Sequence, residues 1–254
     1  QLIETFWPGP LTIILKKSHK VPDETTAGLA TVALRMPNHP IALALIDRSG
    51  IPIAAPSANR SGKPSPTTAQ HVLEDLSHAI PMILDGITPC QVGLESTVLD
   101  MTGEVPTILR PGGVTLEMLR KVLGDVKVDR GVLEPLKKGQ SPKSPGMKYT
   151  HYAPKAQVII FRGPTLDTMT KEINKAAKVY VSKGKKVGIL ATDETIHQYV
   201  DENLLSLGSR KAPASIAARL FNSLREFDHL GVDTILAEWV DERDEGLAIM
   251  NRMI

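Results

Sequence analysis

The sequence predicts an α/β protein built of two domains. Short runs rich in β-branched residues alternate with helical patterns over the first 130 residues, and a stricter alternation of strand and helix follows residue 156. Between them lies a stretch rich in Pro, Gly, Ser and Lys, which is typical of a linker. We therefore expect domains at residues 1–130 and 156–254, joined by a linker at 131–155.

Six runs in the first domain have the composition of strands, with Gly and Pro between them. They are Leu11–Leu15, Thr31–Arg35, Ile51–Ala55, Pro81–Leu84, Ser96–Met101 and Thr107–Arg110. Helices are expected at Ile41–Ile46, at Thr67–Leu76, where Thr67 and Gln70 have the spacing of a capping box, and from Thr115 through Leu123, which Gly124 ends. Because Arg35 and Arg110 each close a strand, they could converge on one end of the sheet.

The second domain alternates regularly. Strand patterns at Gln157–Phe161, Lys186–Ala191, Asn203–Leu207 and Asp233–Trp239 are interleaved with helical patterns at Thr165–Val181, Pro213–Phe227 and Asp244–Met250. Such alternation predicts a parallel, doubly wound sheet. No GxGxxG motif follows a strand, so this pattern by itself indicates no function.

Composition excludes several classes of protein. A hydrophobic content of 42% over 254 residues can bury a full core, and a net charge of +2 is too small for a dedicated nucleic-acid-binding protein. The single cysteine, Cys90, allows no internal disulfide, so we expect a reducing, cytoplasmic compartment. No apolar run approaches the roughly 20 residues of a membrane span. The chain begins at Gln1, and we expect the natural N-terminus to lie upstream.

Motifs for metal and P-loop chemistry are absent from the sequence. Gly62-Lys63 lacks the glycine and the following Ser or Thr of a P-loop, and the seven histidines show neither HxxxH nor HExxH spacing. We therefore expect no protein-held metal ion.

Four loops rich in small polar groups remain as candidate sites. Residues 56–67 join an expected strand to a capped helix and offer hydroxyls, an amide and two cations, a junction that favours anion binding over a plain loop. Residues 7–12 form a Pro-Gly-Pro turn before a strand, and residues 93–98 place hydroxyls at the start of another. Residues 109–114 place Arg110 before a glycine pair; Arg110 and Arg35 could each bind a carboxylate or phosphate, or be solvated charges at strand ends.

Taken together and in order, these segments resemble the YrdC/Sua5 family. The matching blocks are Phe6-Trp7-Pro8-Gly9-Pro10-Leu11-Thr12, Val32-Ala33-Leu34-Arg35-Met36-Pro37, Pro56-Ser57-Ala58-Asn59 with Ser61-Gly62, Glu95-Ser96-Thr97-Val98 and Leu109-Arg110-Pro111-Gly112. The segment Ser144–Pro154, which contains Met147-Lys148-Tyr149-Thr150-His151-Tyr152, resembles the interdomain linker of the long, Sua5-type members.

The resemblance implies a YrdC-like catalytic domain with a twisted sheet, followed by a small Rossmann-like Sua5 domain. It implies that L-threonine, bicarbonate and ATP, with Mg²⁺ accompanying the ATP, give threonylcarbamoyl-AMP and pyrophosphate. A partner, the tRNA threonylcarbamoyltransferase, would then transfer the group to adenosine 37 of tRNA, so that contact of this chain with tRNA would be weak or indirect.

The resemblance also assigns residues. It implies ATP contacts at Thr31, Ser57, Asn59, Ser65, Arg110 and His151, and L-threonine contacts at Arg35, Ala55 and Ser96. With Tyr149 as a neighbour, His151 would make the linker a lid. No covalent nucleophile is implied, because adenylate formation depends on positioning and on cations.

Two alternatives compete with this assignment. Family members carry an N-terminal segment with a Lys-x-Arg pair, which would precede Gln1, and without it the chain could be an RNA-binding YrdC-like protein that lacks activity. The carbamoyltransferase of hydrogenase maturation also contains a YrdC-like domain, but its cysteine-rich zinc motifs are incompatible with a single cysteine.

Overall fold

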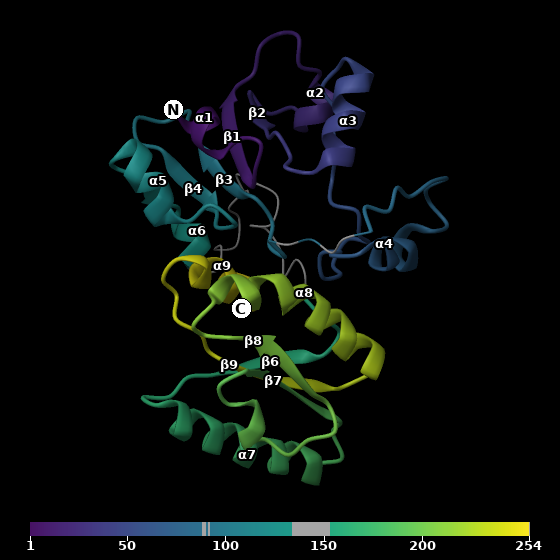
Figure 1. Ribbon diagram of the computed structural model, residues 1–254, viewed down its shortest axis with the longest axis vertical. Coiled ribbons are helices and arrows are strands. Elements are labelled where there is room, and N and C mark those ends of the chain that lie inside the picture. The colour runs from purple at the N-terminus through teal and green to yellow at the C-terminus, as the bar shows by residue number, and fades with distance from the viewer. Residues whose placement is uncertain (88–89, 91, 134–152, 254) are drawn as a thin grey trace. The chain divides into compact units, whose positions relative to one another are not determined.

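The structure, a computed structural model, describes residues 1–87, 90, 92–133 and 153–253 (Figure 1). These residues fall into two compact units. Unit 1 consists of Gln1–Pro56 and the described part of Glu95–Tyr149, and unit 2 consists of Ser57–Leu94 and the described part of Thr150–Ile254. Unit 2 is therefore assembled from two segments that are far apart in the sequence.

Unit 1 is built on a mixed five-stranded sheet. Its strands are β1 (Leu11–Lys16), β2 (Thr31–Leu34), β3 (Thr97–Asp100), β4 (Thr107–Arg110) and β5 (Lys127–Val128), in the spatial order β2-β1-β3-β4-β5. β1 pairs with β2 antiparallel and with β3 parallel, while β4 pairs with β3 antiparallel and with β5 parallel.

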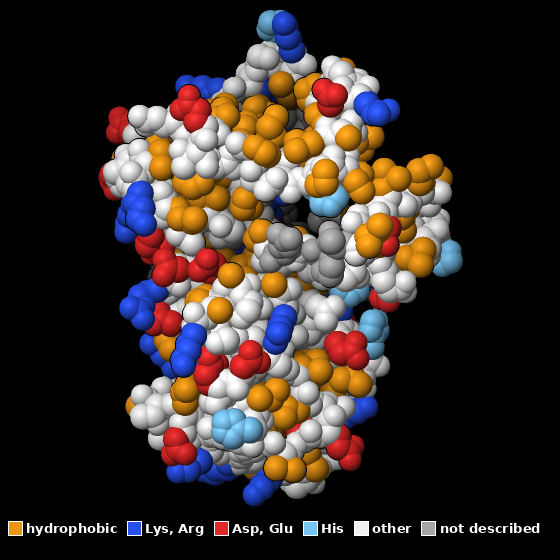
Figure 2. Space-filling model, in the orientation of Figure 1, with side chains coloured by type: hydrophobic (Ala, Val, Ile, Leu, Met, Phe, Trp, Pro, Cys, Tyr) orange, Lys and Arg blue, Asp and Glu red, His pale blue; other side chains and the backbone are white. Residues whose placement is uncertain are grey.

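The helices of unit 1 are mostly short. They are α1 (Leu2–Phe6), α2 (Asp23–Thr26), α3 (Pro40–Ser49), α5 (Leu116–Leu123) and α6 (Arg130–Leu133). The core forms where Leu119 of α5 packs among Leu11, Leu99 and Ile108 of the sheet. By contrast α3 buries none of its residues, and Figure 2 shows apolar side chains gathered on the surface of this unit.

Unit 2 contains a parallel four-stranded sheet. The strands are β6 (Gln157–Phe161), β7 (Val187–Thr192), β8 (Leu204–Gly208) and β9 (Thr234–Glu238), in the order β6-β9-β7-β8, and every pair is parallel. Helix α7 (Leu166–Ser182) covers one face, and α8 (Pro213–Leu230) and α9 (Glu245–Met253) cover the other (Figure 1). A 3-10 turn, η1 (Ile196–Gln198), links β7 to β8. The predicted parallel, doubly wound sheet is confirmed.

An earlier segment of the chain completes unit 2. Helix α4 (Ala69–Leu76) lies in it, and Leu94 joins the core beneath α8. A Cβ placed on Gly93 would lie 2.3 Å from the carbonyl oxygen of Ala217 in α8. Glycine at position 93 therefore lets this segment run directly against the helix.

Three sequence predictions in this fold were wrong. Ile51–Ala55 and Pro81–Leu84 were expected as strands, but neither forms regular secondary structure and Ile51 is 65% exposed. Prolines at positions 52, 56 and 81 carry no backbone N–H, so these runs have strand composition without the donors that a central strand needs. The helix start at Thr67 was one residue early, because Thr68 is the residue whose side chain accepts the hydrogen bond from the His71 N–H.

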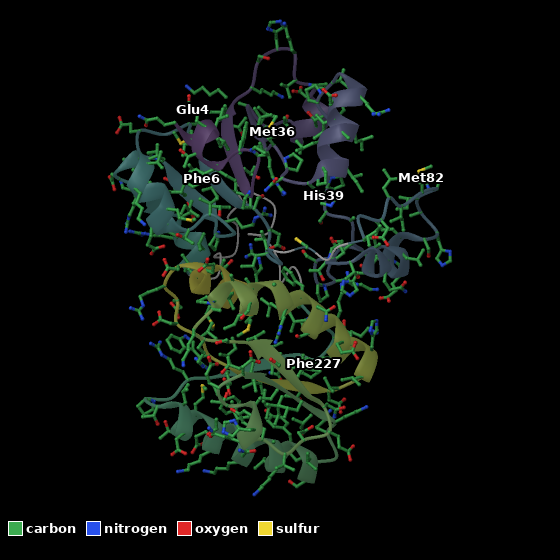
Figure 3. The ribbon with its side chains drawn as sticks, viewed as in Figure 1. Glu4, Phe6, Met36, His39, Met82 and Phe227 are labelled. Atoms are coloured by element: carbon green, nitrogen blue, oxygen red, sulfur yellow. The ribbon has the colours of Figure 1, made fainter. Side chains whose placement is uncertain are left out.

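Phe227 tests the packing of unit 2. Its side chain is fully buried on α8, against Gly188 of β7 (labelled in Figure 3). We expect Phe227→Ala to lower the free energy of unfolding by about 3–5 kcal/mol, because it removes buried apolar atoms and leaves a cavity. Urea unfolding followed by circular dichroism measures this, with the exposed Val181→Ala on α7 as the control. An equal decrease in the free energy of unfolding for the two variants would contradict this packing.

Candidate active site

The strand directions of unit 1 bring several polar residues to one edge of its sheet. Because β1 and β3 are parallel and pair antiparallel with β2 and β4, the starts of β1 and β3 lie beside the ends of β2 and β4. This edge carries Thr12, Arg35, Ser96 and Arg110. The expected convergence of the two arginines on one end of the sheet is confirmed.

Ser96 and Arg110 are in direct contact at this edge. The Nε and Nη2 atoms of Arg110 donate to the carbonyl oxygen of Ser96 at 3.1 and 2.9 Å, and Nη2 also lies 3.2 Å from Ser96 Oγ. On the other side, Ser96 Oγ is 2.7 Å from Thr12 Oγ1. Ser96 is buried, whereas Arg110 and Thr12 are half-buried. The result is a row of donors and acceptors that faces partly outward.

Close backbone packing fixes the position of this row. A Cβ on Gly112 would lie 2.2 Å from the carbonyl oxygen of Glu95, and a Cβ on Gly9 would lie 2.3 Å from that of Phe6. The buried Thr97 hydroxyl donates to the Val114 carbonyl at 2.5 Å and accepts from the Val114 N–H at 3.0 Å. Glycine at position 112 therefore lets the main chain run directly against the start of β3, and glycine at position 9 permits the tight turn that precedes β1.

Two other predicted contacts of unit 1 are not among the residues of this row. Thr31 pairs with Lys16 at the far end of β1, so it is about 13 Å along β2 from Arg35 at the usual rise per residue. Ala55 is exposed in the irregular segment that ends unit 1.

The loop at Ser57–Thr67 belongs to unit 2, where the carboxylate of Asp75 organises it. Asp75 Oδ2 accepts from the Arg60 N–H at 3.3 Å, and Oδ1 accepts from Lys63 Nζ at 2.6 Å. From α8, Arg225 Nη2 donates to Asp75 Oδ2 at 2.7 Å and to the carbonyl oxygen of Pro64 at 2.6 Å. The Asp75 side chain is fully buried and that of Arg225 is 4% exposed, so this is a buried ion pair.

These contacts determine the protonation of the Asp75 carboxyl. Burial raises its pKa, but hydrogen bonds from Arg225 and Lys63 outweigh burial and lower the pKa to about 2. The neighbouring His71 is affected in the same direction, since burial and the charge of Arg225 lower the pKa of its imidazole. The cluster therefore holds a carboxylate beside two cationic side chains near neutral pH.

The three predicted contacts within this loop differ in exposure. Ser57 is exposed, Asn59 is half-buried and Ser65 is buried. Asn59 Nδ2 donates to the carbonyl oxygens of Arg60 and Lys63 at 3.0 and 3.1 Å. Within the described part of the chain, its Oδ1 atom is buried and has no hydrogen-bond partner. The amide thus holds the turn and leaves one acceptor unused.

The linker prediction lies outside the described residues. His151 and Tyr149 both fall within 134–152, so the predicted lid stays a prediction. Across the described ranges, which omit 88–89, 91, 134–152 and 254, there is no group of three or more His, Cys, Asp or Glu side chains that could hold a metal ion.

A second polar cluster lies at the carboxyl edge of the parallel sheet. The fully buried Glu238 accepts hydrogen bonds from the hydroxyls of Thr192, Thr195 and Tyr199 and from Arg210 Nη2. Burial and the adjacent Glu238 carboxylate raise the pKa of Tyr199, which therefore stays protonated. Because Glu238 is bonded on both oxygens, this cluster joins the loops after β7 and β8 to the sheet.

Sequence reasoning missed three residues of these sites. Thr12 belongs to a turn motif and was not assigned a contact, and nothing singled out Asp75 or Arg225. One signal was present for Arg225, because it follows Leu224 and lies four residues after Phe221 on the apolar side of the α8 pattern.

Comparisons with known proteins agree along the whole chain. A family model described as telomere recombination matches residues 1–112, and one described as threonylcarbamoyl-AMP synthase, C-terminal domain, matches residues 114–254. The chain belongs to the Sua5 family of threonylcarbamoyl-AMP synthases. It is therefore an enzyme with the two-sheet architecture that the sequence predicted.

Individual members of the Sua5 family match closely. The chain is 47% identical to the threonylcarbamoyl-AMP synthase of Bacillus subtilis over 254 residues, which cover 100% of this chain and 71% of the relative. It is 48% identical to that of Pyrococcus abyssi over 252 residues, 99% of this chain and 71% of the relative. A crystal structure of P. abyssi Sua5 complexed with L-threonine superposes with a TM-score of 0.91 at 47% identity, over 99% of this chain and 71% of that chain.

None of the helices that the structure describes is long and apolar enough to cross a lipid bilayer.

The acid dependence of stability tests the Asp75 carboxylate. The pKa of Asp75 is lowered from 3.8 to about 2 on folding, so its ionised form stabilises the fold above about pH 4, and this contribution is lost as the pH falls towards 2. We expect Asp75→Asn to lower the free energy of unfolding by about 3 kcal/mol near neutral pH, because Arg225 is left buried without a counter-charge. Below pH 4 we expect this difference between the two proteins to shrink as the pH falls.

Urea unfolding of both proteins at a series of pH values measures this difference. The remaining titratable groups are common to the two proteins, including Lys63, His71 and Arg225 around Asp75. A difference between the two proteins that stays constant from neutral pH to the acid range would contradict the lowered pKa.

Proposed function

We propose that this chain is the L-threonylcarbamoyladenylate synthase of tRNA modification, a nucleotidyltransferase that converts L-threonine, bicarbonate and ATP to threonylcarbamoyl-AMP and pyrophosphate. The observation that carries the proposal is the similarity to named synthases over 99–100% of the chain. The product would pass to a tRNA threonylcarbamoyltransferase, which would form the t6A base at position 37 of the anticodon loop.

The row at the edge of the first sheet supports a threonine site. Arg35, Ser96 and Ala55 are the proposed contacts to L-threonine. The guanidinium of Arg35 can pair with the amino-acid carboxylate through two parallel hydrogen bonds. The similar P. abyssi Sua5 has been solved as a complex with L-threonine, which supports this choice of ligand.

The contact between Ser96 and Arg110 supports joining this threonine site to a nucleotide site. Arg110 is a proposed ATP contact, together with Thr31, Ser57, Asn59, Ser65 and His151, and its Nη2 atom lies 3.2 Å from the hydroxyl of Ser96, a proposed threonine contact. Bond formation between the two substrates requires their reacting atoms to approach to about 3–3.5 Å. Because the two proposed contacts touch one another, substrates bound to them would lie side by side, which supports such an approach.

The chemistry needs positioning and charge rather than a nucleophilic side chain. The threonine amine first adds to CO₂ with loss of a proton, or condenses with bicarbonate with loss of water, to give a carbamate. A carbamate oxygen then attacks the α-phosphorus of ATP, the new O–P bond forms, and the bond to the bridging oxygen breaks as pyrophosphate leaves with its electron pair. Arg110 would hold phosphate oxygens as negative charge shifts towards the leaving group.

Mg²⁺ is proposed to enter with the ATP, where phosphate oxygens are its preferred hard ligands and offset their negative charge. The three side chains that contact one another at the row, Thr12, Ser96 and Arg110, are hydroxyls and a guanidinium, which suit phosphate and carboxylate oxygens. We therefore assign these residues to the substrates and none of them to the ion.

Pyrophosphate release from Mg-ATP tests the proposed reaction. We expect release that requires both L-threonine and bicarbonate, falls when either is omitted, and is weaker with L-serine, which lacks the methyl group. The B. subtilis relative, assayed in parallel, serves as the positive control. Release that ignores threonine or bicarbonate, or no release while the relative is active, would contradict the proposed reaction for this chain.

Arg110 provides the corresponding mutational test. We expect Arg110→Met to lower kcat/KM by roughly 100-fold, because a preorganised cation is lost where negative charge develops. The matched control is Arg120→Met on α5, whose guanidinium donates to the Val126 carbonyl and lies outside the row. If both variants retain wild-type kcat/KM, Arg110 does not contact the nucleotide.

A further inference from the structure

We propose that Arg225 of α8 is a positioning residue, which holds the Ser57–Thr67 loop in the conformation that binds ATP. The proposal rests on the proposed function, since it takes this loop as part of the nucleotide site. It gives a role in catalysis to a helix of the second family domain, to which neither the motifs nor the comparisons assign one.

The guanidinium of Arg225 reaches the loop directly. Its Nη2 atom donates to the carbonyl oxygen of Pro64 at 2.6 Å, a main-chain acceptor next to the proposed ATP contact Ser65. Pro64 and Ser65 are both buried. Because Pro64 cannot rotate freely about φ, a bond to its carbonyl also restricts the direction in which the chain enters Ser65.

Arg225 reaches the other side of the turn through Asp75. One carboxylate oxygen of Asp75 accepts from Arg225 Nη2 and from the Arg60 N–H, and the other accepts from Lys63 Nζ. Arg60, Lys63 and Pro64 of the loop are therefore all bonded to the buried pair formed by Asp75 and Arg225. Gly62, with φ +92°, forms the bend between these attachment points.

The chemistry of the pair favours a positioning role over a purely stabilising one. Buried ion pairs of this kind are often replaced by apolar residues with little loss of stability, because desolvation of the two charges cancels most of their attraction. A planar guanidinium, in contrast, fixes the direction of several acceptors at once, here a carboxylate and a carbonyl. An apolar pair can fill the same space but cannot hold the carbonyl oxygen of Pro64.

The segment of unit 2 that contains α4 has other contacts with α8. His229 Nε2 lies 3.2 Å from Glu74 Oε2 on the exposed side of the same two helices, and Leu94 packs into the core beneath α8. Since these contacts do not involve the Ser57–Thr67 loop, loss of Arg225 should release the loop without undocking α4. Ordering of the loop and docking of the helices can therefore be separated by experiment.

The test compares three variants: Arg225→Met, Arg225→Lys and the double variant Asp75→Leu/Arg225→Met. The double variant removes both buried charges, so we expect its urea midpoint to stay near that of the wild type. We nevertheless expect its KM for ATP to rise by about tenfold with KM for L-threonine unchanged, because the loop has lost the guanidinium that orders it. Arg225→Lys retains a positive charge beside Asp75 but lacks the planar guanidinium, so we expect its KM for ATP to lie between those of the wild type and the double variant.

The matched control is His229→Ala, which removes the exposed contact between the same helices. We expect wild-type values of both KM constants for this variant. The proposal is overturned if the double variant has wild-type KM for ATP, or if KM for ATP and KM for L-threonine rise by the same factor in it, as a general loss of structure would produce.

Hydrogen exchange decides the positioning step independently of activity. We expect amides of residues 57–68 to exchange about tenfold faster in the double variant than in the wild type, with the amides of α8 unchanged. Unchanged exchange in the loop overturns the proposal whatever the kinetics show. If the wild-type chain releases no pyrophosphate, the proposed function fails, while the exchange result still decides whether Arg225 orders the loop.

Discussion

A carboxylate and a guanidinium removed from water can persist only if each satisfies the other, and the pair formed by Asp75 and Arg225 imposes that constraint on unit 2. The side chains come from two segments of the sequence, and each also bonds the loop between Arg60 and Pro64. Movement of either helix or of the loop would leave a buried charge without a partner. The position of the loop relative to α4 and α8 therefore depends on this one electrostatic arrangement.

In unit 1 the sheet itself, rather than a long loop, positions the polar groups of the candidate site. The directions of the four strands bring two strand starts and two strand ends to the same edge, and Gly112 allows the main chain to approach the start of β3 closely there. Ser96 and Arg110 then meet through ordinary sheet geometry. This edge needs few specialised residues, because the topology determines their distances.

The sequence predicted regular elements well where periodicity was strong, and poorly where composition alone had to decide. The strand at Gln157–Phe161 and the helix capped by Thr115 were located to the residue, since alternation and capping have direct physical causes. Ile51–Ala55 has apolar residues typical of a strand but no partner strand, and pairing is a tertiary property. For the site, family motifs indicated Ser96 and Arg110. Asp75 was beyond sequence reasoning because an acidic residue in a helix usually faces solvent, and only the fold reveals that it is buried.

The discontinuity of unit 2 has a consequence for how the chain acquires its structure. Asp75 and Arg225 are 150 residues apart, so the Ser57–Thr67 loop and α4 cannot reach their final contacts until α8 has left the ribosome. Closing so long a loop carries an entropic cost that must be met before the contact is formed, which makes this a late event in assembly. During synthesis, the Ser57–Thr67 loop and α4 therefore lack their final contacts while the following residues are added. The Ser57–Thr67 loop would then become ordered only after α8 has been made, so that a chain interrupted before α8 would lack an ordered loop.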